Sequence, residues 1–110
     1  ECEEGDMDAL TAVSGSGPAY CFYLAEAMIE AGINLGLPPN DAAKMTAATL
    51  KGAMVLLESQ SLSAEELRRK VTSPGGTTEA AIKVLDDHSV KQIIIQAVAA
   101  AAQRSKELSG

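Results

Sequence analysis

The stretch Val71-Thr72-Ser73-Pro74-Gly75-Gly76-Thr77-Thr78-Glu79 separates two helical patterns, one ending near Lys70 and one covering about 77–85. Pro74 lacks an N–H group and disfavours helix at Ser73, while the two adjacent glycines free the backbone from Cβ constraints. The threonines then place hydroxyl groups beside the unpaired N–H groups that begin the next helix. The sequence therefore predicts a tight turn between two helices.

This turn is suited to holding an anion. The first N–H groups of a helix lack partners within the helix and lie at the positive end of its dipole. The predicted donors are the N–H groups of Gly75, Gly76, Thr77 and Thr78. A P-loop needs a lysine directly after its last glycine, and Thr77 follows Gly76 instead, so a small carboxylate fits better than a triphosphate. The alternative is an ordinary connection between helices.

Length and composition predict one domain, since 110 residues with 46% hydrophobic content suffice for a core. Tyr20, Phe22 and Tyr23 are the only aromatic residues, so the core is expected to form from close helix contacts among aliphatic side chains. The formal net charge of -6 argues against nucleic acid or an anionic membrane surface as a partner.

The cysteines and the single histidine give no metal or disulfide pattern. Cys2 and Cys21 lack paired metal spacing and are too few for a disulfide scaffold, so reduced thiols in a cytoplasmic protein are expected. No hydrophobic run is long enough to span a bilayer, and residues 1–4 do not resemble a signal peptide, so we expect a soluble chain. His88 lies beside two aspartates without a second histidine, so it is predicted to be solvated. No Ser/His/Asp triad can be argued.

Helical periodicity predicts about five main helices and no strands. Residues 1–8 are expected to be frayed, and 7–13 to form one or two helical turns. Pro18 suits the first position of a helix that continues to Leu35 and stops at Gly36. The other predicted helices run from Pro39 or Asp41 to Glu58, from Ser63 to about Val71, from Thr77 to about Leu85 with an end near Asp86-Asp87, and from Val90 to Leu108.

Helix ends carry recognisable caps. Ser63 and Glu66 have the spacing of a capping box, and three basic residues fill the last turn of the same helix, where the dipole favours cations. Ser89 is expected to cap the last helix. Several helices have apolar faces too broad for one neighbour to cover, so the all-α fold is expected to need a partner.

Residues 15–20, Gly-Ser-Gly-Pro-Ala-Tyr, superficially match the dinucleotide-binding fingerprint. Tyr20 stands where the third glycine of that fingerprint belongs, and no apolar strand precedes the segment, so the match is rejected. The glycines are instead predicted to permit a tight entry into a buried helix.

Three segments together carry a family resemblance: residues 14–20 (Ser-Gly-Ser-Gly-Pro-Ala-Tyr), residues 36–38 (Gly-Leu-Pro) and residues 71–80. In this order they resemble the C-terminal domain of pyrroline-5-carboxylate reductase, over nearly the whole chain. Family members have an N-terminal Rossmann domain for NAD(P)H, and no part of it occurs here. The chain is therefore interpreted as a fragment of a longer reductase, expected to be inactive alone.

The resemblance implies an all-helical dimerisation domain that interlocks with a second subunit, similar to the C-terminal domain of 6-phosphogluconate-dehydrogenase-like enzymes. It implies reduction of 1-pyrroline-5-carboxylate to L-proline, the last step of proline biosynthesis. NADPH or NADH would be bound mainly by the missing domain. The expected assembly is a homodimer, or a higher oligomer built from it, without nucleic acid, membrane or metal.

Site roles follow from the same resemblance. Ser73 and the N–H groups of Gly75, Gly76 and Thr77 would hold the substrate carboxylate. The Thr78 hydroxyl would contact the ring nitrogen, which makes Thr78 the catalytic candidate.

Tyr20 would approach the nicotinamide side of the pocket, with a buried core tyrosine as the equally weighted alternative. Two other functions remain open. One is a purely structural dimerisation module without affinity for small carboxylates, and the other is the helical domain of another dehydrogenase acting on imines or hydroxy acids.

Overall fold

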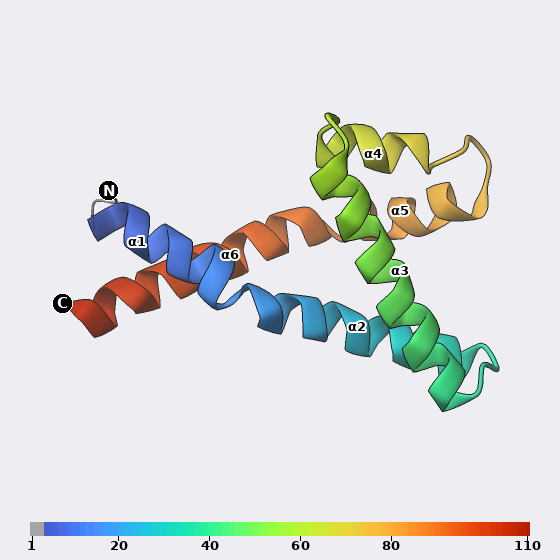
Figure 1. Cartoon of the computed structure of the whole chain (residues 1–110), viewed down its shortest axis with the longest axis horizontal. Coiled ribbons are helices and arrows are strands. Elements are labelled where there is room, and N and C mark those ends of the chain that lie inside the picture. Colours follow the sequence, from blue (N-terminus) through green and yellow to red (C-terminus); the bar gives the residue numbers. More distant parts are fainter. Residues whose placement is uncertain (1–3) are drawn as a thin grey trace. The chain divides into compact units, whose positions relative to one another are not determined.

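The computed structural model describes residues 4–110, and these residues form helices and turns without any strand (Figure 1). The elements are α1 (Glu4–Leu10), the π-helical turn η1 (Thr11–Gly15), α2 (Gly17–Asn34), α3 (Pro39–Ser59), α4 (Ala64–Lys70), α5 (Thr77–Asp87) and α6 (Val90–Ser109). The all-α prediction is confirmed. The five main helices expected from the sequence are α2 to α6, and α1 with η1 precedes them.

The chain separates into two compact units. The terminal unit contains the residues up to Tyr20 together with Glu79–Gly110, and the central unit is Cys21–Thr78. Helices α2 and α5 each contribute residues to both units. The expectation of one domain over the whole chain stays a prediction.

The terminal unit is built on α1, η1 and α6, which lie side by side (Figure 1). Ala12 of η1 is fully buried, and Asp8 is nearly so. The Ser105 hydroxyl donates a hydrogen bond of 2.8 Å to the Asp8 carboxylate. The prediction that the acidic start is frayed is therefore wrong from Glu4 onward, because these residues form α1 and α1 contacts α6, with Ser105 bonded to the Asp8 carboxylate. Residues 1–3 lie outside the described part.

In the central unit, a short turn joins α2 to α3 and ends α2 as predicted. Gly36 has φ of +106°, and its N–H donates to the Ile33 carbonyl at 3.0 Å. The Leu37 N–H donates to the Gly32 carbonyl at 3.0 Å, which completes a Schellman motif. A Cβ on Gly32 would lie 3.2 Å from Leu37 Cδ1 and 3.4 Å from Ala42 Cβ, so this glycine permits the close approach of α3.

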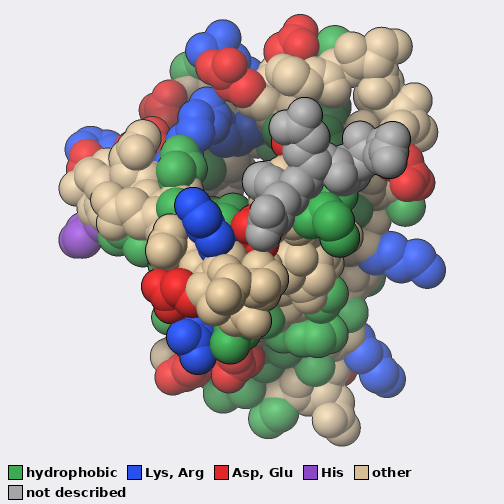
Figure 2. All heavy atoms as spheres, turned by 90° about the vertical axis from the view of Figure 1, so that its left-hand side faces the viewer, with side chains coloured by type: hydrophobic (Ala, Val, Ile, Leu, Met, Phe, Trp, Pro, Cys, Tyr) green, Lys and Arg blue, Asp and Glu red, His purple; other side chains and the backbone are tan. Residues whose placement is uncertain are grey.

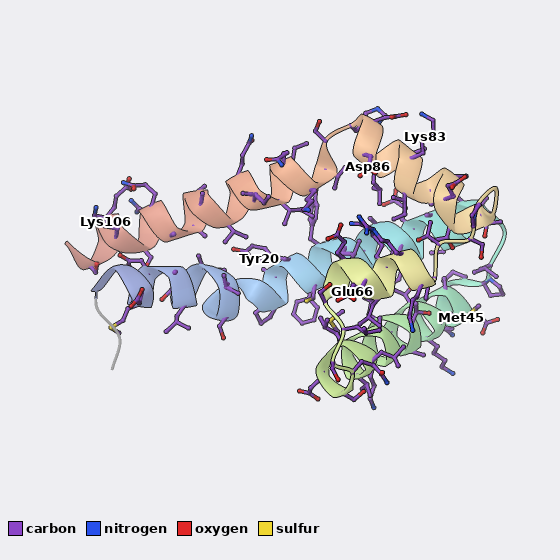
Figure 3. The ribbon with its side chains drawn as sticks, turned by 90° about the horizontal axis from the view of Figure 1, so that it is seen from above. Tyr20, Met45, Glu66, Lys83, Asp86 and Lys106 are labelled. Atoms are coloured by element: carbon purple, nitrogen blue, oxygen red, sulfur yellow. The ribbon has the colours of Figure 1, made fainter. Side chains whose placement is uncertain are left out.

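The capping box at the start of α4 is confirmed. The Glu66 N–H donates to the Ser63 hydroxyl at 3.1 Å, and the Ser63 N–H donates to the Glu66 carboxylate at 3.0 Å. The pKa of Glu66 is lowered because hydrogen bonds from Ser63 stabilise the charged carboxylate. The Ser63 N–H makes the larger contribution and the Ser63 hydroxyl the smaller one. Figure 3 shows Glu66 on this short helix.

The prediction that the Ser89 hydroxyl caps α6 is wrong. Ser89 occupies the N-cap position, but its side chain makes no capping hydrogen bond. Its φ of 55° is left-handed, and its N–H donates to the Asp86 carbonyl at 3.0 Å, so the residue serves to end α5. A hydroxyl cap normally needs an extended backbone at this position. His88 is exposed as expected, with Nδ1 2.9 Å from the Val84 carbonyl oxygen.

Large apolar side chains are widely exposed in this chain. Within the described residues, Ala12 and Ala42 are the only buried hydrophobic ones. Figure 2 shows apolar side chains at the surface beside charged ones. The exposed set on α2 and α3 includes Phe22, Tyr23, Leu24, Ile33, Met45, Met54, Val55, Leu56 and Leu57. Such faces are typical of helices that pack against another chain.

Candidate functional site: the turn between α4 and α5

The chain leaves α4 with three of the last four carbonyl groups of the helix, those of Leu67, Arg68 and Arg69, hydrogen-bonded. The Val71 N–H donates to the Leu67 carbonyl at 3.3 Å, and the Thr72 N–H donates to the Arg69 carbonyl at 3.1 Å. The Thr72 hydroxyl donates to the Arg68 carbonyl. These bonds anchor the start of the predicted anion-binding turn on α4.

Residues 73–76 then form a β-turn. The Gly76 N–H donates to the Ser73 carbonyl at 3.1 Å, with Pro74 in the second position and Gly75, at φ of +74°, in the third. This combination has the sequence and backbone features of a type II turn. A Cβ on Gly76 would lie 3.3 Å from the Ser73 carbonyl oxygen, so the second glycine keeps the turn tight.

The turn changes the set of N–H groups that face a ligand. We expected the Gly76 N–H to be one of four converging donors, but it donates to the Ser73 carbonyl within the turn. The N–H groups of Thr77 and Thr78, the first residues of α5, form no hydrogen bond with any described residue. They lie at the positive end of an 11-residue helix, so they are suited to an anion.

Two hydroxyl groups accompany these amides in the central unit. Ser73 is exposed and Thr78 is half-buried. Neither hydroxyl is hydrogen-bonded within the described part of the chain, so both are available to a ligand. The segment from Ser73 to Thr78 contains no acidic, basic or histidine side chain. It can therefore bind and orient a carboxylate, but it offers no strong acid or base.

Tyr20, which the sequence predicts as a cofactor contact, belongs to the terminal unit. Figure 3 labels this residue. Its hydroxyl donates a 2.6 Å hydrogen bond to the carbonyl of the buried Ala12, and its ring is half-buried. A phenol has a single O–H, so this proton is already used inside the chain. The geometry favours the alternative of a structural tyrosine, and a role beside the nicotinamide stays a prediction.

The remaining sequence candidates add no further centre. Among the described residues, no three His, Cys, Asp or Glu side chains are grouped as metal ligands would be. Cys21 is a free, exposed thiol, whereas Cys2 lies outside the described residues. Over the same described range, every helix falls short of the combined length and apolarity that a bilayer crossing needs.

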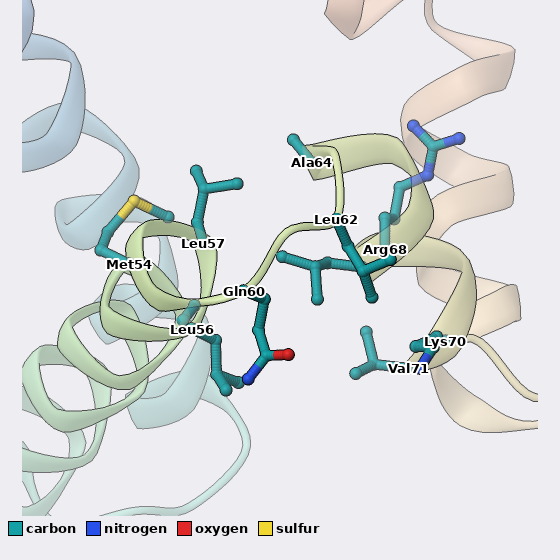
Figure 4. Close-up of a pocket in the computed structure, with 11 residues that line it drawn as sticks. Met54, Leu56, Leu57, Gln60, Leu62, Ala64, Arg68, Lys70 and Val71 are labelled. Atoms are coloured by element: carbon teal, nitrogen blue, oxygen red, sulfur yellow. The ribbon is translucent and has the colours of Figure 1, made fainter.

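Sequence reasoning missed a pocket of about 450 Å³ between the end of α3 and α4 (Figure 4). Its lining is mainly apolar and includes Met54, Leu57, Leu62, Leu67 and Val71, with Arg68 beside them. The sequence did contain a sign of this pocket, because residues 52–57 of α3 are apolar on nearly every side of the helix. A broad apolar face does not reveal where a concave surface forms.

A helical chain whose apolar faces remain exposed is typical of the class of helical domains that pack against a second chain. The family model described as pyrroline-5-carboxylate reductase dimerisation matches residues 4–108. The chain belongs to this family, which confirms the resemblance seen in the three sequence segments.

Curated relatives agree over nearly the whole chain. The pyrroline-5-carboxylate reductase of Pseudomonas aeruginosa is 50% identical over 107 residues, which cover 97% of this chain and 39% of that protein. The reductase of Corynebacterium melassecola is 46% identical over 108 residues, which cover 98% of this chain and 40% of that protein. The chain thus spans 39–40% of the length of these relatives.

Solved structures show the same fold. The Plasmodium falciparum pyrroline carboxylate reductase, determined with NADP bound, superposes with a TM-score of 0.94 at 34% identity, covering 100% of this chain and 42% of that one. The Coxiella burnetii pyrroline-5-carboxylate reductase gives 0.93 at 44% identity, covering 98% and 40%. The all-helical architecture is therefore that of the family.

Proposed function

We propose that this chain is the dimer-forming and carboxylate-binding part of a reductase that converts 1-pyrroline-5-carboxylate to L-proline with NADPH or NADH. The observation that carries the proposal is the 50% identity to the Pseudomonas aeruginosa reductase over 97% of this chain. The hydrogen-bond donors at the start of α5 supply an independent physical argument, because the substrate is a small carboxylate.

The carboxylate is held at the turn in this proposal. The N–H groups of Thr77 and Thr78 point from the positive end of α5, and the exposed Ser73 hydroxyl adds a third donor. Hydrogen bonds to a charged group are stronger than those between neutral groups. The roles of Ser73, Gly75 and Gly76 in contacting substrate stay predictions of the sequence.

Thr78 orients the reacting ring. The nicotinamide cofactor, when bound, supplies the hydride that goes to the imine carbon, and a proton ends on the ring nitrogen. The half-buried Thr78 hydroxyl contacts this nitrogen and relays or orients a proton from water. A threonine hydroxyl is too weak an acid to be the ultimate donor near neutral pH. A substrate that enters already protonated is the more electrophilic form.

The cofactor is held mainly outside this chain. A dinucleotide site needs a strand, a glycine-rich turn and a helix, and the described residues contain no strand. The chain's own contribution is therefore to bind and orient the substrate.

A homodimer completes the proposal. Two copies that interlock would cover the apolar faces of α2 and α3, which remain exposed within one chain. A cytoplasmic location is also proposed, because the free Cys21 thiol is typical of a reducing compartment.

A domain exchange tests the function. This chain replaces the matching C-terminal region of the Pseudomonas aeruginosa reductase, and pyrroline-5-carboxylate-dependent oxidation of NAD(P)H is measured. We expect activity within about tenfold of the parent enzyme, because the two regions are 50% identical. Each tenfold corresponds to about 1.4 kcal/mol of the activation barrier. A folded, dimeric hybrid without activity or affinity for proline would instead support a structural module.

A further inference from the structure

We infer that the pocket between α3 and α4 of one copy receives the Phe22 side chain on α2 of a second copy, with Glu26 of that copy paired to Arg68. The inference rests on the proposed homodimer and specifies which surfaces form it. All the residues concerned lie in the central unit.

The pocket has the properties of a receptor for an apolar side chain. Leu57 from α3 and Leu67 from α4 are among its lining residues, and its volume is about 450 Å³. Figure 4 shows the Arg68 side chain at one side of the pocket, with its guanidinium pointing away from the other lining side chains. Arg68 forms no ion pair with any other described side chain. Lys70 lines the pocket as well, so an occupant that is apolar and carries negative charge would match both the apolar lining and these two cations.

Helix α2 carries such an occupant. Phe22 is 69% exposed, and the chain has only two other aromatic residues. Glu26, Ile29 and Ile33 follow Phe22 at helical spacing, so the four side chains share one stripe. A carboxylate within an apolar stripe is costly to cover unless a cation pairs with it. Glu26, like Arg68, forms no ion pair among the described residues.

Neither surface is covered within one copy. Met54 and Leu56 of the pocket remain 54% and 48% exposed while Phe22 remains exposed, so α2 does not fill the pocket of its own chain. In a two-fold dimer the contact occurs twice, because each copy supplies one pocket and one stripe. Aromatic anchors in central pockets contribute strongly to interfaces, which makes Phe22 the expected anchor.

Charge reversal with mixing tests the pairing. Arg68→Glu and Glu26→Arg are made separately in the 110-residue chain, and dimer dissociation is measured by sedimentation at several concentrations. Each variant alone places like charges together at both contacts, so its dissociation constant should rise about tenfold or more. In a one-to-one mixture, the heterodimer has opposite charges at both contacts. We expect it to form in preference to either homodimer.

The matched control is Arg69→Glu on the same helix. Arg69 already forms an exposed ion pair with Glu65 at 2.7 Å, so reversing its charge should change dimerisation less than about threefold. Circular dichroism of every variant checks helix content. If a reversal variant is poorly folded, the milder Arg68→Gln and Glu26→Gln replacements are made singly and together. The proposal then requires that their effects on the dimer dissociation constant are coupled and do not simply add.

The outcomes separate the pairing from the dimer itself. The pairing is overturned if the wild-type chain is dimeric but the mixed reversal variants form no more heterodimer than homodimer, or if the cycle shows no coupling. Either result is compatible with the homodimer itself. A monomeric wild-type chain overturns both. Preferential heterodimer formation supports the pairing, because rescue by mixing requires the two side chains to meet across the interface.

Discussion

The turn at residues 73–78 and the apolar faces of α2 and α3 depend on different kinds of interaction. The turn is determined locally, by the Gly76 to Ser73 hydrogen bond and by the positive φ of Gly75. The faces of α2 and α3 leave large side chains exposed, so their packing is incomplete within one copy. The backbone of the turn is therefore set by short-range interactions, whereas the apolar faces of α2 and α3 are left uncovered within one copy.

The largest predicted effect concerns the chain by itself. The isolated 110-residue chain should show no detectable pyrroline-5-carboxylate-dependent NAD(P)H oxidation, because hydride transfer needs a cofactor positioned by another region. The spectrophotometric assay used for the domain exchange measures this directly, with the active hybrid as positive control. Activity of the purified chain would show that the turn and its helices suffice for catalysis.

Replacement of the exposed hydroxyl in the turn comes next. In the active hybrid, Ser73→Ala should remove roughly 1.5–3 kcal/mol of carboxylate binding, since the hydrogen bond joins a charged group. The bond is expected to be equal in ground and transition states, so the loss should appear mainly in KM. Ser63→Ala, at the start of α4, is the control and should leave KM unchanged. An unaltered KM in Ser73→Ala would remove this hydroxyl from the site.

Thr78 should respond differently, because the ring nitrogen changes from imine to amine during the reaction. Thr78→Val in the hybrid should lower kcat by ~10-fold or more, since a hydroxyl beside this nitrogen stabilises the transition state preferentially. Thr72→Val is the control, because its hydroxyl bonds the Arg68 carbonyl. If Thr78→Val instead loses about 1 kcal/mol of stability, seen as a lower melting temperature, and keeps a normal kcat, then Thr78 is a structural cap.

The smallest predicted effect tests whether the turn is determined by its own backbone conformation. Gly75→Ala should destabilise the chain by about 1–2 kcal/mol, because an L-residue resists the left-handed backbone that Gly75 adopts. Gly52→Ala in α3 is the control; its Cβ meets no atom within 4 Å, and alanine favours helix. Chemical denaturation of both variants measures the difference. Equal stabilities would mean that the turn tolerates another backbone conformation.

The sequence predicted those elements that neighbouring residues determine. The Ser63 capping box, the stop at Gly36 and the start of α5 at Thr77 all depend on chemistry within a few residues. The contact between Asp8 and Ser105 could not be predicted, because it joins residues 97 positions apart and requires α1 and α6 to pack.

Backbone conformation limited the prediction of the site itself. The pattern Ser-Pro-Gly-Gly-Thr-Thr indicated an anion-binding turn, but it did not reveal that the Gly76 N–H closes that turn. Similarly, Ser89 has a good capping side chain in a backbone conformation that ends α5 instead. Residue type predicts which groups are present, whereas the dihedral angles decide where those groups point.

The most direct test of this account is the assembly state of the unmodified chain. Light scattering at micromolar concentration should give the mass of two 11.4 kDa chains, and the melting temperature should rise with protein concentration. Both results follow if a second copy covers the apolar faces of α2 and α3. A stable, well-folded monomer whose melting temperature is independent of concentration would contradict the account.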